Sequence, residues 1–400
     1  MSNPCIIIGA SHAGTQLALS LRQQGWQDEI LLISDESSLP YQRPPLSKSF
    51  LSGEKKVDDI FIRPSSAFEK ANVSFLLNTR VTKINRQDKT LLLSTGETLQ
   101  YAKLALCTGA SALQIPLAGN DKKGVHYLRT LQDAQSIRQY VAKDKHAVII
   151  GGGFIGLESA AILNKMGMKV TVLEAQERLL QRVVSIQVSD FYHKAHTQAG
   201  VNIRHKTCAT SINGHEQVTS VTDQDGNQYP ADLVIIGVGV RPQIQLAQDC
   251  GLSVENGILI NEFAQTSDPD IVAAGDATCF YHSIYQRDIR LESIQNAMDQ
   301  AKAAAASLCG KTIDFSATIP RFWSDQYDLK LQIIGLSDGY DQLEIRGEME
   351  TGKSFSIFYL KNSKLLCAAM VNAPRVLMKA QQFIKIQQPI TAQDLDEIFK

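Results

Sequence analysis

The sequence lacks three features, and each absence excludes a class of protein. Its seven cysteines are scattered and form no C-x-x-C or C-x-x-x-x-C pair, so neither a disulfide framework nor a cysteine metal site is expected. The formal net charge is −1, which gives no basic surplus for binding nucleic acid. No apolar run reaches the roughly 18 residues that a membrane-spanning helix needs.

The first residues also lack the features of an export signal. A strand-like run, CIIIG, begins at Cys5 with no charged segment and no cleavage site before it. We therefore expect a cytoplasmic protein whose thiols are inert and mostly buried. The length of 400 residues predicts two or three domains.

The sequence does contain one unit that occurs twice. The first copy reads IIIGASHAGTQLALSLRQQG and then EILLISDE: a β-branched run, a turn of small residues, a helical pattern and a second strand. The second copy reads AVIIGGGFIGLESAAILNKMG and then KVTVLEA. Each copy continues to a hairpin with a turn glycine, Gly96 or Gly226, and closes on an apolar strand, LALCTG or LVIIGVG. The sequence thus predicts an α/β protein with a duplicated unit.

Both copies have a glycine-rich turn of the kind that binds a dinucleotide. In the G-x-G-x-x-G pattern the first glycine allows a tight turn, the second lets the backbone approach a pyrophosphate, and the third lets the helix pack on the strand. The glycines are Gly9 and Gly14 in the first copy and Gly151, Gly153 and Gly156 in the second. Ser11 takes the middle position of the first copy and slightly crowds the approach to a pyrophosphate.

An acidic residue ends the second strand of each copy, Asp35 in the first and Glu174 in the second. An acid at this place binds ribose hydroxyls. Glu174 favours NADH over NADPH, because a 2′-phosphate would meet a like charge, although Arg178 could soften the repulsion. Two nucleotide folds in one chain indicate two nucleotides held at once, a retained flavin and a diffusible nicotinamide. The alternative is that one copy is empty and serves only for packing.

Residues 40–50 read PYQRPPLSKSF and end by presenting Lys48. The paired prolines cannot donate backbone hydrogen bonds, so we expect a rigid, shaped loop rather than a strand or helix. A lysine in such a loop is either an ordinary solvated cation or a cation held in place for a purpose.

Several long motifs resemble the FAD-dependent ferredoxin and rubredoxin reductases of bacterial oxygenase systems, the putidaredoxin reductase-like family. The motifs are PYQRPPLSKSFL, GGGFIGLE, RVVSIQVSDFY, ADLVIIGVGVRP, TSDPDIVAAGDAT, RLESIQNAMDQA and FWSDQYDLKLQ. The resemblance runs over nearly the whole chain. It implies two Rossmann-like dinucleotide-binding domains of the glutathione-reductase-like kind and a small α+β C-terminal domain.

The implied domains are an FAD-binding domain of residues 1–112 and 244–318, an NADH-binding domain of residues 113–243 and a C-terminal domain of residues 319–400. The sequence supports the last of these independently. The short alternating runs LQIIGL, QLEIRGEM, FSIFYL and KLLCAAMV predict a small antiparallel sheet, and a helical stretch follows Pro374.

The resemblance also gives Lys48 a role. In similar proteins this lysine lies by the flavin nitrogen that accepts the hydride and pairs with the glutamate of the second glycine motif, here Glu158. A fixed cation there would stabilise the negative charge that arrives with the hydride. Glu158, expected in the first turn of its helix, would keep the lysine charged and aimed.

The other site residues follow from the resemblance, position by position. The implied FAD contacts, besides Gly9 and Gly14, are Ala13, Asp35, Arg43, Lys48, Val81, Arg129, Asp276, Ile294 and Trp323. The implied NADH contacts are Gly151, Gly153, Ile155, Gly156 and Glu174.

The implied reaction takes a hydride from NADH onto FAD and passes single electrons to an iron–sulfur protein, either a ferredoxin, a Rieske-type ferredoxin or a rubredoxin. A disulfide reductase or a single-cysteine peroxidase is less consistent with the sequence, because the loop that holds Lys48 has no thiol. A nucleotide-sensing flavoprotein of the apoptosis-inducing-factor type and a thiol-independent NADH oxidase stay open as alternatives.

Overall fold

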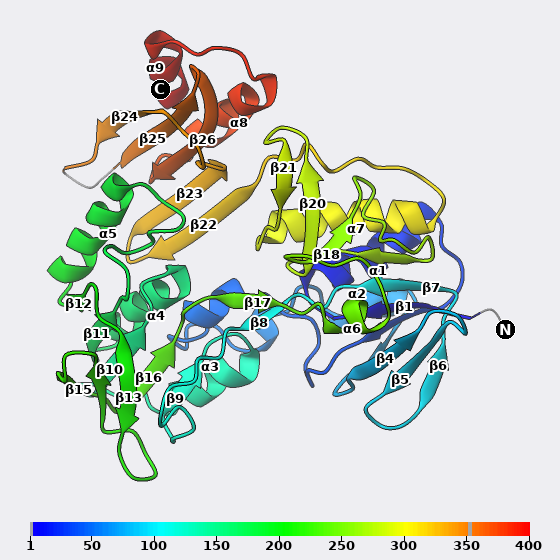
Figure 1. Ribbon diagram of the computed structural model, residues 1–400, viewed down its shortest axis with the longest axis horizontal. Coiled ribbons are helices and arrows are strands. Elements are labelled where there is room, and N and C mark those ends of the chain that lie inside the picture. Colours follow the sequence, from blue (N-terminus) through cyan, green and yellow to red (C-terminus); the bar gives the residue numbers. More distant parts are fainter. Residues whose placement is uncertain (1–2, 351–353) are drawn as a thin grey trace. The chain divides into compact units, whose positions relative to one another are not determined.

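The computed structural model describes residues 3–350 and 354–400, which form two compact units (Figure 1). Unit 1 comprises residues 1–42, 58–111 and 241–320, and unit 2 comprises residues 43–57, 112–240 and 321–400. The short segment 43–57, which includes Lys48, therefore belongs to unit 2 although unit 1 flanks it in the sequence. The predicted boundaries of the FAD and NADH domains stay predictions.

The centre of unit 1 is a parallel sheet with the strand order β19-β7-β1-β2-β3. Its strands are β1 Cys5–Ile8, β2 Ile30–Ile33, β3 Val73–Leu76, β7 Lys103–Leu106 and β19 Ile271–Ala273. Strands β1, β2 and β19 are buried over nearly their whole length, which is why they read as continuous apolar runs. Helices α1 His12–Gln24 and α7 Ile294–Leu308 pack against each other.

The centre of unit 2 repeats this plan, with the parallel strand order β12-β11-β10-β16-β9. Its strands are β9 Val125–Tyr127, β10 His146–Ile150, β11 Lys169–Leu173, β12 Asn202–Arg204 and β16 Leu233–Ile236, and its helices are α3 Leu131–Arg138, α4 Phe154–Lys165 and α5 Ile186–Gln198. The predicted duplication is confirmed.

Each copy also carries a three-stranded antiparallel sheet where the sequence predicted a hairpin. In unit 1 this is β4 Val81–Asn85, β5 Thr90–Leu93 and β6 Thr98–Gln100. In unit 2 it is β13 Ala209–Asn213, β14 Ser220–Asp223 and β15 Gln228–Pro230.

The remaining short elements of unit 1 lie outside the repeated plan. They are η2 Asp58–Ile60, α2 Ser65–Lys70, α6 Gln245–Asp249, β18 Ile258–Ile260, β20 Thr278–His282 and β21 Arg287–Ile289. The last three strands form a small mixed sheet. The chain passes between the units at β8 Ala110–Ala112 and β17 Val240–Pro242.

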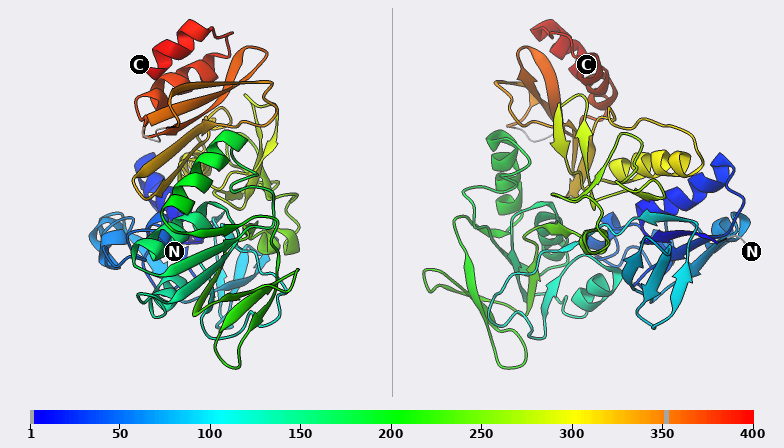
Figure 2. Two further views of the ribbon diagram at one scale, coloured as in Figure 1. Left: turned by 90° about the vertical axis from the view of Figure 1, so that its left-hand side faces the viewer. Right: turned by 45° about the vertical axis from the view of Figure 1, so that its right-hand side comes forward.

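The C-terminal part of unit 2 is an antiparallel sheet with the order β22-β23-β26-β25-β24 and two helices on it (Figures 1 and 2). Its elements are β22 Arg321–Gln326, β23 Leu329–Gly335, β24 Gln342–Glu348, β25 Ser354–Lys361, β26 Lys364–Val371, α8 Val376–Ile386 and α9 Ala392–Phe399. The four predicted strands and the helix after Pro374 are confirmed. Strand β22 was not predicted as a strand, because Ser324, Asp325 and Gln326 are polar and its pairing with β23 is a tertiary effect.

A shared apolar core joins this sheet to helix α5. Val188 and Tyr192 of α5 are fully buried with Phe355, Ile357 and Tyr359 of β25. The hydroxyl of Tyr359 donates to Ser185 Oγ at 3.0 Å, just before α5 begins. Strand β22 and helix α5 are therefore parts of one packed body, which the site described below requires.

The segment around Lys48 was predicted as a rigid, shaped loop rather than a strand or helix, and it contains a short helical turn. Residues Pro44–Ser47 form a single 3-10 turn, η1, and Lys48 follows as its C-cap. Proline is tolerated there because the first residues of a helical turn have no use for their N–H groups. In the described part of the chain, no helix is long and apolar enough to cross a membrane.

Candidate functional site

The outer glycines of both turns are fixed by packing. Gly9 and Gly151 adopt φ values of +109° and +110°, which L side chains rarely adopt. A Cβ on Gly14 would lie 2.0 Å from the Gly9 carbonyl oxygen, and one on Gly156 would lie 2.2 Å from that of Gly151. The helix thus starts in direct contact with the turn before it, as the motif requires.

The middle position is different. A Cβ on Gly153 would meet no atom within 4 Å, so nothing in the protein itself requires glycine there. Gly153 is the N-cap of α4, and Ser11 is the N-cap of α1. Neither of these two fully described helices has a side-chain cap or an acidic residue in its first turn. Open helix starts with unopposed N–H groups fit the phosphates of a nucleotide.

The acids at the ends of the second strands have different partners. Glu174 accepts from the Gly152 N–H at 2.6 Å and from the Gln176 N–H at 2.7 Å, so its carboxylate is held against the glycine turn. Asp35 is exposed and pairs with Arg80 at 2.8 Å, which brings the start of β4, where Val81 is buried, beside it.

Arg178 is held by its own loop. Its guanidinium donates to the Val184 carbonyl oxygen at 2.8 Å and to that of Gln181 at 3.0 Å. Its guanidinium is therefore held by backbone carbonyl oxygens, and its effect on a 2′-phosphate stays a prediction.

The second half of unit 1 meets the first glycine turn. A Cβ on Gly275, which has φ +93°, would lie 3.2 Å from the Cβ of Ala13 in α1. Asp276, the next residue, therefore lies close to the start of α1. Ile294 is the first residue of α7, the helix that packs on α1. The structure brings four of the predicted FAD contacts, Ala13, Gly14, Asp276 and Ile294, to this region of unit 1.

Lys48 forms a buried ion pair with Glu158. The Lys48 ammonium lies 2.6 Å from Glu158 Oε2, and the side chains are 16% and 3% exposed. The pairing implied by the resemblance is present in the structure. Glu158 was expected in the first turn of its helix. Because helix α4 begins at Phe154, Glu158 lies one residue past that turn, and the helix dipole stabilises a carboxylate less at this position.

Two serines that the sequence analysis did not single out complete the surroundings of Glu158. The hydroxyl of Ser47 donates to Oε2 and that of Ser324 donates to Oε1, both at 2.6 Å. The nearly buried carboxylate thus has three donors, which take the place of the water it would contact in solution. The serines are 111 and 166 residues from Glu158 in the chain, so no local spacing could have found them.

The remaining predicted contacts are distributed as follows. Arg43 donates to the carbonyl oxygen of Arg129 at 2.6 Å, so these two residues meet within unit 2. Ile155 and Trp323 are 44% and 37% exposed, which places Trp323 at the surface of β22 rather than in a core. The rings of Phe154 and Phe322 pack at 4.4 Å beside them. The roles of all these residues stay predictions.

The cysteines are all free thiols. Cys107 is buried, and burial raises the pKa of its thiol to about 12. Burial also raises the pKa of the Cys279 thiol, which is buried in β20. A thiol with a raised pKa is a poor nucleophile at neutral pH.

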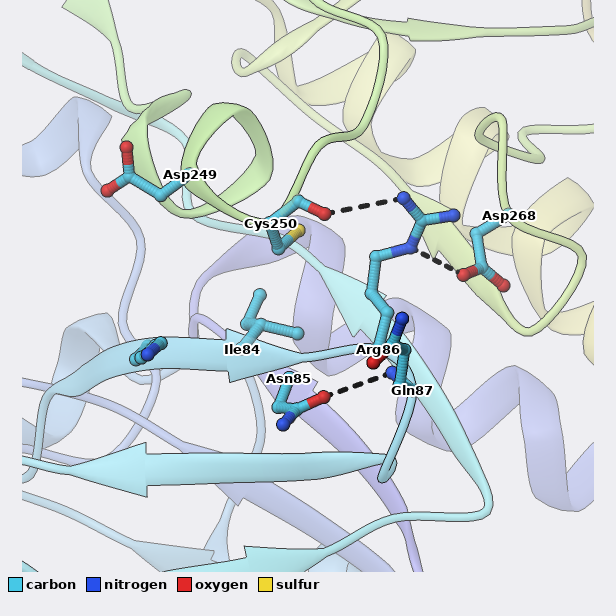
Figure 3. Close-up of a pocket in the computed structure, with 8 residues that line it drawn as sticks. Ile84, Asn85, Arg86, Gln87, Asp249, Cys250 and Asp268 are labelled. Carbon is cyan, nitrogen blue, oxygen red and sulfur yellow. Dashed lines mark hydrogen bonds and ion pairs between the residues drawn. The ribbon is translucent and has the colours of Figure 1, made fainter.

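A hollow of about 550 Å³ lies at the end of β4 in unit 1. Figure 3 shows the residues that line it. Arg86 crosses it and pairs with Asp268 at 2.7 Å, while its guanidinium also donates to the Cys250 and Gly251 carbonyl oxygens. The arginine is thus used to join β4 to the later part of unit 1. None of the predicted site residues lines this hollow.

The comparisons with known proteins agree with the geometry. Residues 3–301 match the family model described as pyridine nucleotide-disulphide oxidoreductase, and residues 321–398 match the one described as reductase C-terminal. The chain is 41% identical to a putidaredoxin reductase of Pseudomonas putida over 96% of this chain and 92% of that protein. It is 37% identical to a rubredoxin-NAD(+) reductase of Pseudomonas putida, over 92% of this chain and 96% of that protein.

A solved structure is also similar throughout. The reductase in the crystal structure of a covalent putidaredoxin reductase–putidaredoxin complex matches with a TM-score of 0.95 and 40% identity, over 100% of this chain and 96% of that one. Enzymes of the matched family use FAD and a nicotinamide nucleotide, and the two open glycine turns fit two such cofactors. The resemblance drawn from the sequence is therefore confirmed: the chain is an oxidoreductase that belongs to the pyridine nucleotide-disulphide oxidoreductase family.

Proposed function

We propose that this protein takes a hydride from NADH onto FAD and passes the electrons one at a time to an iron–sulfur protein of an oxygenase system. The observation that carries the proposal is the buried ion pair between Lys48 and Glu158. Segment 43–57 supplies this fixed cation and contains no cysteine, so electrons have no thiol there to enter.

The chain's own residues would act by holding charge. FAD, when bound, supplies the ability to accept a hydride and to release single electrons. Glu158 accepts from the Ser47 and Ser324 hydroxyls and holds the Lys48 ammonium in one place. A preorganised cation stabilises the negative charge that develops as the hydride arrives, and it does so without a reorganisation cost at that moment.

The two open glycine turns would hold the two cofactors. The start of α1, with Asp35 and Asp276, would bind FAD, and the start of α4, with Gly153 and Glu174, would bind NADH. Glu174 is already aligned along its turn by the Gly152 N–H. The NADPH 2′-phosphate would meet this carboxylate, while Arg178 is held by the carbonyl oxygens of its own loop, so NADH is preferred.

The names of the relatives support the choice of acceptor. They are reductases of putidaredoxin and rubredoxin, and one of the similar structures contains putidaredoxin. The reduced, unpaired state of the seven cysteines is consistent with a cytoplasmic enzyme. The site itself does not distinguish between a ferredoxin and a rubredoxin as the acceptor.

The experiment is turnover of the purified, FAD-loaded chain with NADH and a panel of [2Fe–2S] ferredoxins, Rieske-type ferredoxins and rubredoxins. We expect NADH-dependent reduction of at least one of them, with cytochrome c or a monooxygenase as the final reporter. Reduction of FAD by NADH without transfer to any of these acceptors would instead favour a sensing flavoprotein or an oxidase.

The role of Lys48 is tested by stopped-flow mixing of NADH with the Lys48→Ala variant. We expect bound FAD but slower reduction of it, because the substitution removes a charge that matters most as the hydride arrives. Lys55→Ala is the matched control, since Lys55 lies in the same segment and is exposed. Equal reduction rates in the two variants would make Lys48 an ordinary structural lysine.

A further inference from the structure

A buried chain of polar side chains continues beyond Glu158. Ser324 Oγ lies 2.6 Å from Glu158 Oε1, and Gln326 Nε2 lies 3.1 Å from Ser324 Oγ. On its other side, Gln326 Oε1 lies 2.7 Å from His196 Nε2. The hydroxyl of Tyr327 lies 3.2 Å from His196 Nδ1 and ends the chain.

The chain is as buried as any apolar core. Ser324, Gln326 and His196 are each 0% exposed. Ser324 and Gln326 stand two apart on β22, so both point to the inward face, while Asp325 between them is exposed. Polar groups in such a place must satisfy one another, because each unsatisfied group costs about 1–3 kcal/mol.

The direction of every hydrogen bond follows from counting protons, starting at the carboxylate. Glu158 can only accept, so Ser324 must use its one proton to donate to Oε1. Ser324 then accepts from the Gln326 amide nitrogen, which turns the Gln326 carbonyl oxygen toward His196. That oxygen can only accept, so His196 carries its proton on Nε2.

The contact between Tyr327 and His196 has its donor and acceptor in the same order as the other hydrogen bonds. A neutral His196 protonated on Nε2 has a free lone pair on Nδ1, which accepts from the Tyr327 hydroxyl. Burial lowers the pKa of His196 from its ordinary value, against a smaller opposing effect of the bond to Gln326, and His193 lowers it further. A neutral ring agrees with the direction set by the other contacts.

We propose that Ser324, Gln326 and His196 are positioning residues, forming a one-way series of hydrogen-bond donors that ends on Glu158 and keeps this carboxylate aimed at Lys48. The inference rests on the proposed function, because it matters only if Lys48 acts during hydride transfer. Hydrogen bonds in a chain that all point one way polarise each other and strengthen the last one.

The division of labour around Glu158 supports this assignment. Oε2 is shared by the Lys48 ammonium and the Ser47 hydroxyl, both from segment 43–57. Among the described residues, Oε1 accepts a hydrogen bond from Ser324 only. Without Ser324 the carboxylate would be held at one oxygen only and could rotate about its last bond, which would move the ammonium with it.

The first experiment compares two serine variants of the FAD-loaded protein. Ser324→Ala should lower the limiting rate of FAD reduction by NADH about tenfold, the size expected for one lost hydrogen bond to a charged group, with FAD content and the Kd for NADH unchanged. Ser356→Ala is the matched control: Ser356 is 0% exposed in the same sheet, and its hydroxyl has no hydrogen-bond partner among the described residues. It should stay within twofold of the parent.

The second experiment changes the direction of the hydrogen bonds around Gln326. In Gln326→Glu a new carboxylate would compete for the Ser324 proton and attract a second proton onto His196. The rate of FAD reduction should fall about tenfold as in Ser324→Ala, because Glu158 loses the same donor. The folded state is checked by the melting temperature of both variants.

The third measurement does not depend on activity. In ¹⁵N-histidine NMR spectra, with the signal assigned by a His196→Gln variant, His196 should be neutral with its proton on Nε2 in the parent and protonated on both nitrogens in Gln326→Glu. This readout reports the direction of the chain even in protein without FAD.

The outcomes are separable. A parent protein that NADH does not reduce would overturn the proposed function, while the NMR result would still decide the direction of the chain. Normal reduction of the parent, together with equal rates in Ser324→Ala and Ser356→Ala, would overturn the positioning role alone. A proton on Nδ1 of His196 in the parent would overturn the direction of the chain and with it the proposal.

Discussion

The two glycine turns of this protein are alike where the fold needs them and differ where a ligand would lie. The outer glycines match closely, with φ values of +109° and +110° at Gly9 and Gly151. The middle positions, Ser11 and Gly153, do not match, and Gly153 has open space around it. Packing inside the protein thus explains why the outer positions are glycine. At the middle position, glycine leaves room for a ligand rather than for a protein atom.

The two copies also differ in the partners of their acidic residues and in the residue that follows the third glycine by two positions. Glu174 is bonded to its own glycine turn, whereas Asp35 is exposed and paired with Arg80. Two residues after the third glycine, α4 has Glu158, paired with Lys48, and α1 has Gln16, which donates to Ser20. The helix of the second copy therefore holds a buried ion pair, and the helix of the first copy has a neutral glutamine at the matching position.

The largest effect is expected from the third glycine. Gly156→Ala would place a methyl group 2.2 Å from the Gly151 carbonyl oxygen, and Gly14→Ala would place one 2.0 Å from that of Gly9. Backbone must move in both cases, so we expect the free energy of unfolding to fall by about 3 kcal/mol or more. Denaturant unfolding monitored by circular dichroism measures this loss.

Gly153→Ser is the control for that prediction, because it gives the second turn the residue of the first and meets no protein atom within 4 Å. It should leave the unfolding free energy nearly unchanged and weaken NADH binding. A destabilisation as large as that of Gly156→Ala would show that the middle glycine is structural after all.

The next largest effect is expected from Glu158→Gln, which gives the second helix the residue type found at Gln16 in the first. Lys48 would lose its charged partner, and we expect FAD to be retained while its reduction by NADH slows by about a hundredfold. Stopped-flow measurements on Glu158→Gln, Lys48→Ala and the double variant test this. Effects of the two substitutions that simply add would argue against a shared role, since a pair that acts as one unit is strongly non-additive.

Replacing the acid at the end of the second strand by its amide should have an intermediate effect. Glu174→Gln removes the like charge that a 2′-phosphate would meet, so the preference for NADH over NADPH should narrow by about tenfold. The ratio of kcat/KM for the two nucleotides measures it. Asp35→Asn should leave that ratio unchanged, because Asp35 belongs to the other turn. A parent that uses both nucleotides equally would contradict the assignment.

Ser11→Gly should have a small effect, because it gives the first turn the glycine of the second. The serine side chain makes no cap hydrogen bond to α1, so its loss costs the helix little. We expect FAD affinity to rise by no more than about threefold, since a glycine opens the approach but also adds flexibility. Fluorescence titration of FAD-free protein measures the change.

The smallest effect is expected from the thiols. Cys107 stands where the second copy has Gly237: its carbonyl oxygen faces Gly9 as that of Gly237 faces Gly151. Because burial raises the pKa of Cys107 to about 12, it stays protonated and unreactive at pH 8. Cys107→Ser and Cys279→Ser should each keep electron transfer within a few-fold of the parent. Activity lost on alkylation and restored in one of these variants would reveal a thiol enzyme.

The sequence was informative where structure is local. In each copy the first strand, the glycine turn, the helix after it, the second strand, the hairpin and the closing strand each lie within one short stretch, so spacing identified them. Alternation identified four of the five C-terminal strands. The pairing of Lys48 with Glu158 came only from resemblance, because the two are far apart in the chain.

The rest of the site left no pattern in the sequence. Ser47, Ser324, Gln326 and His196 are ordinary polar residues, and only tertiary packing makes them buried partners. The polar strand β22 was missed for the same reason. The helical turn Pro44–Ser47 was predicted as a rigid loop, because the prolines were judged by the rules for the interior of a helix and not by those for its first turn.

The composition of unit 2 from three separate stretches has a consequence for how the enzyme is made. Ser47 and Lys48 leave the ribosome before Glu158, which follows Ser47 by 111 residues, and Ser324 emerges 166 residues after Glu158. Contacts of such long sequence separation form late, because their loop-closure entropy must be met first. A nascent chain can therefore complete both of its nucleotide turns while the pair of Lys48 and Glu158 still lacks its donor Ser324.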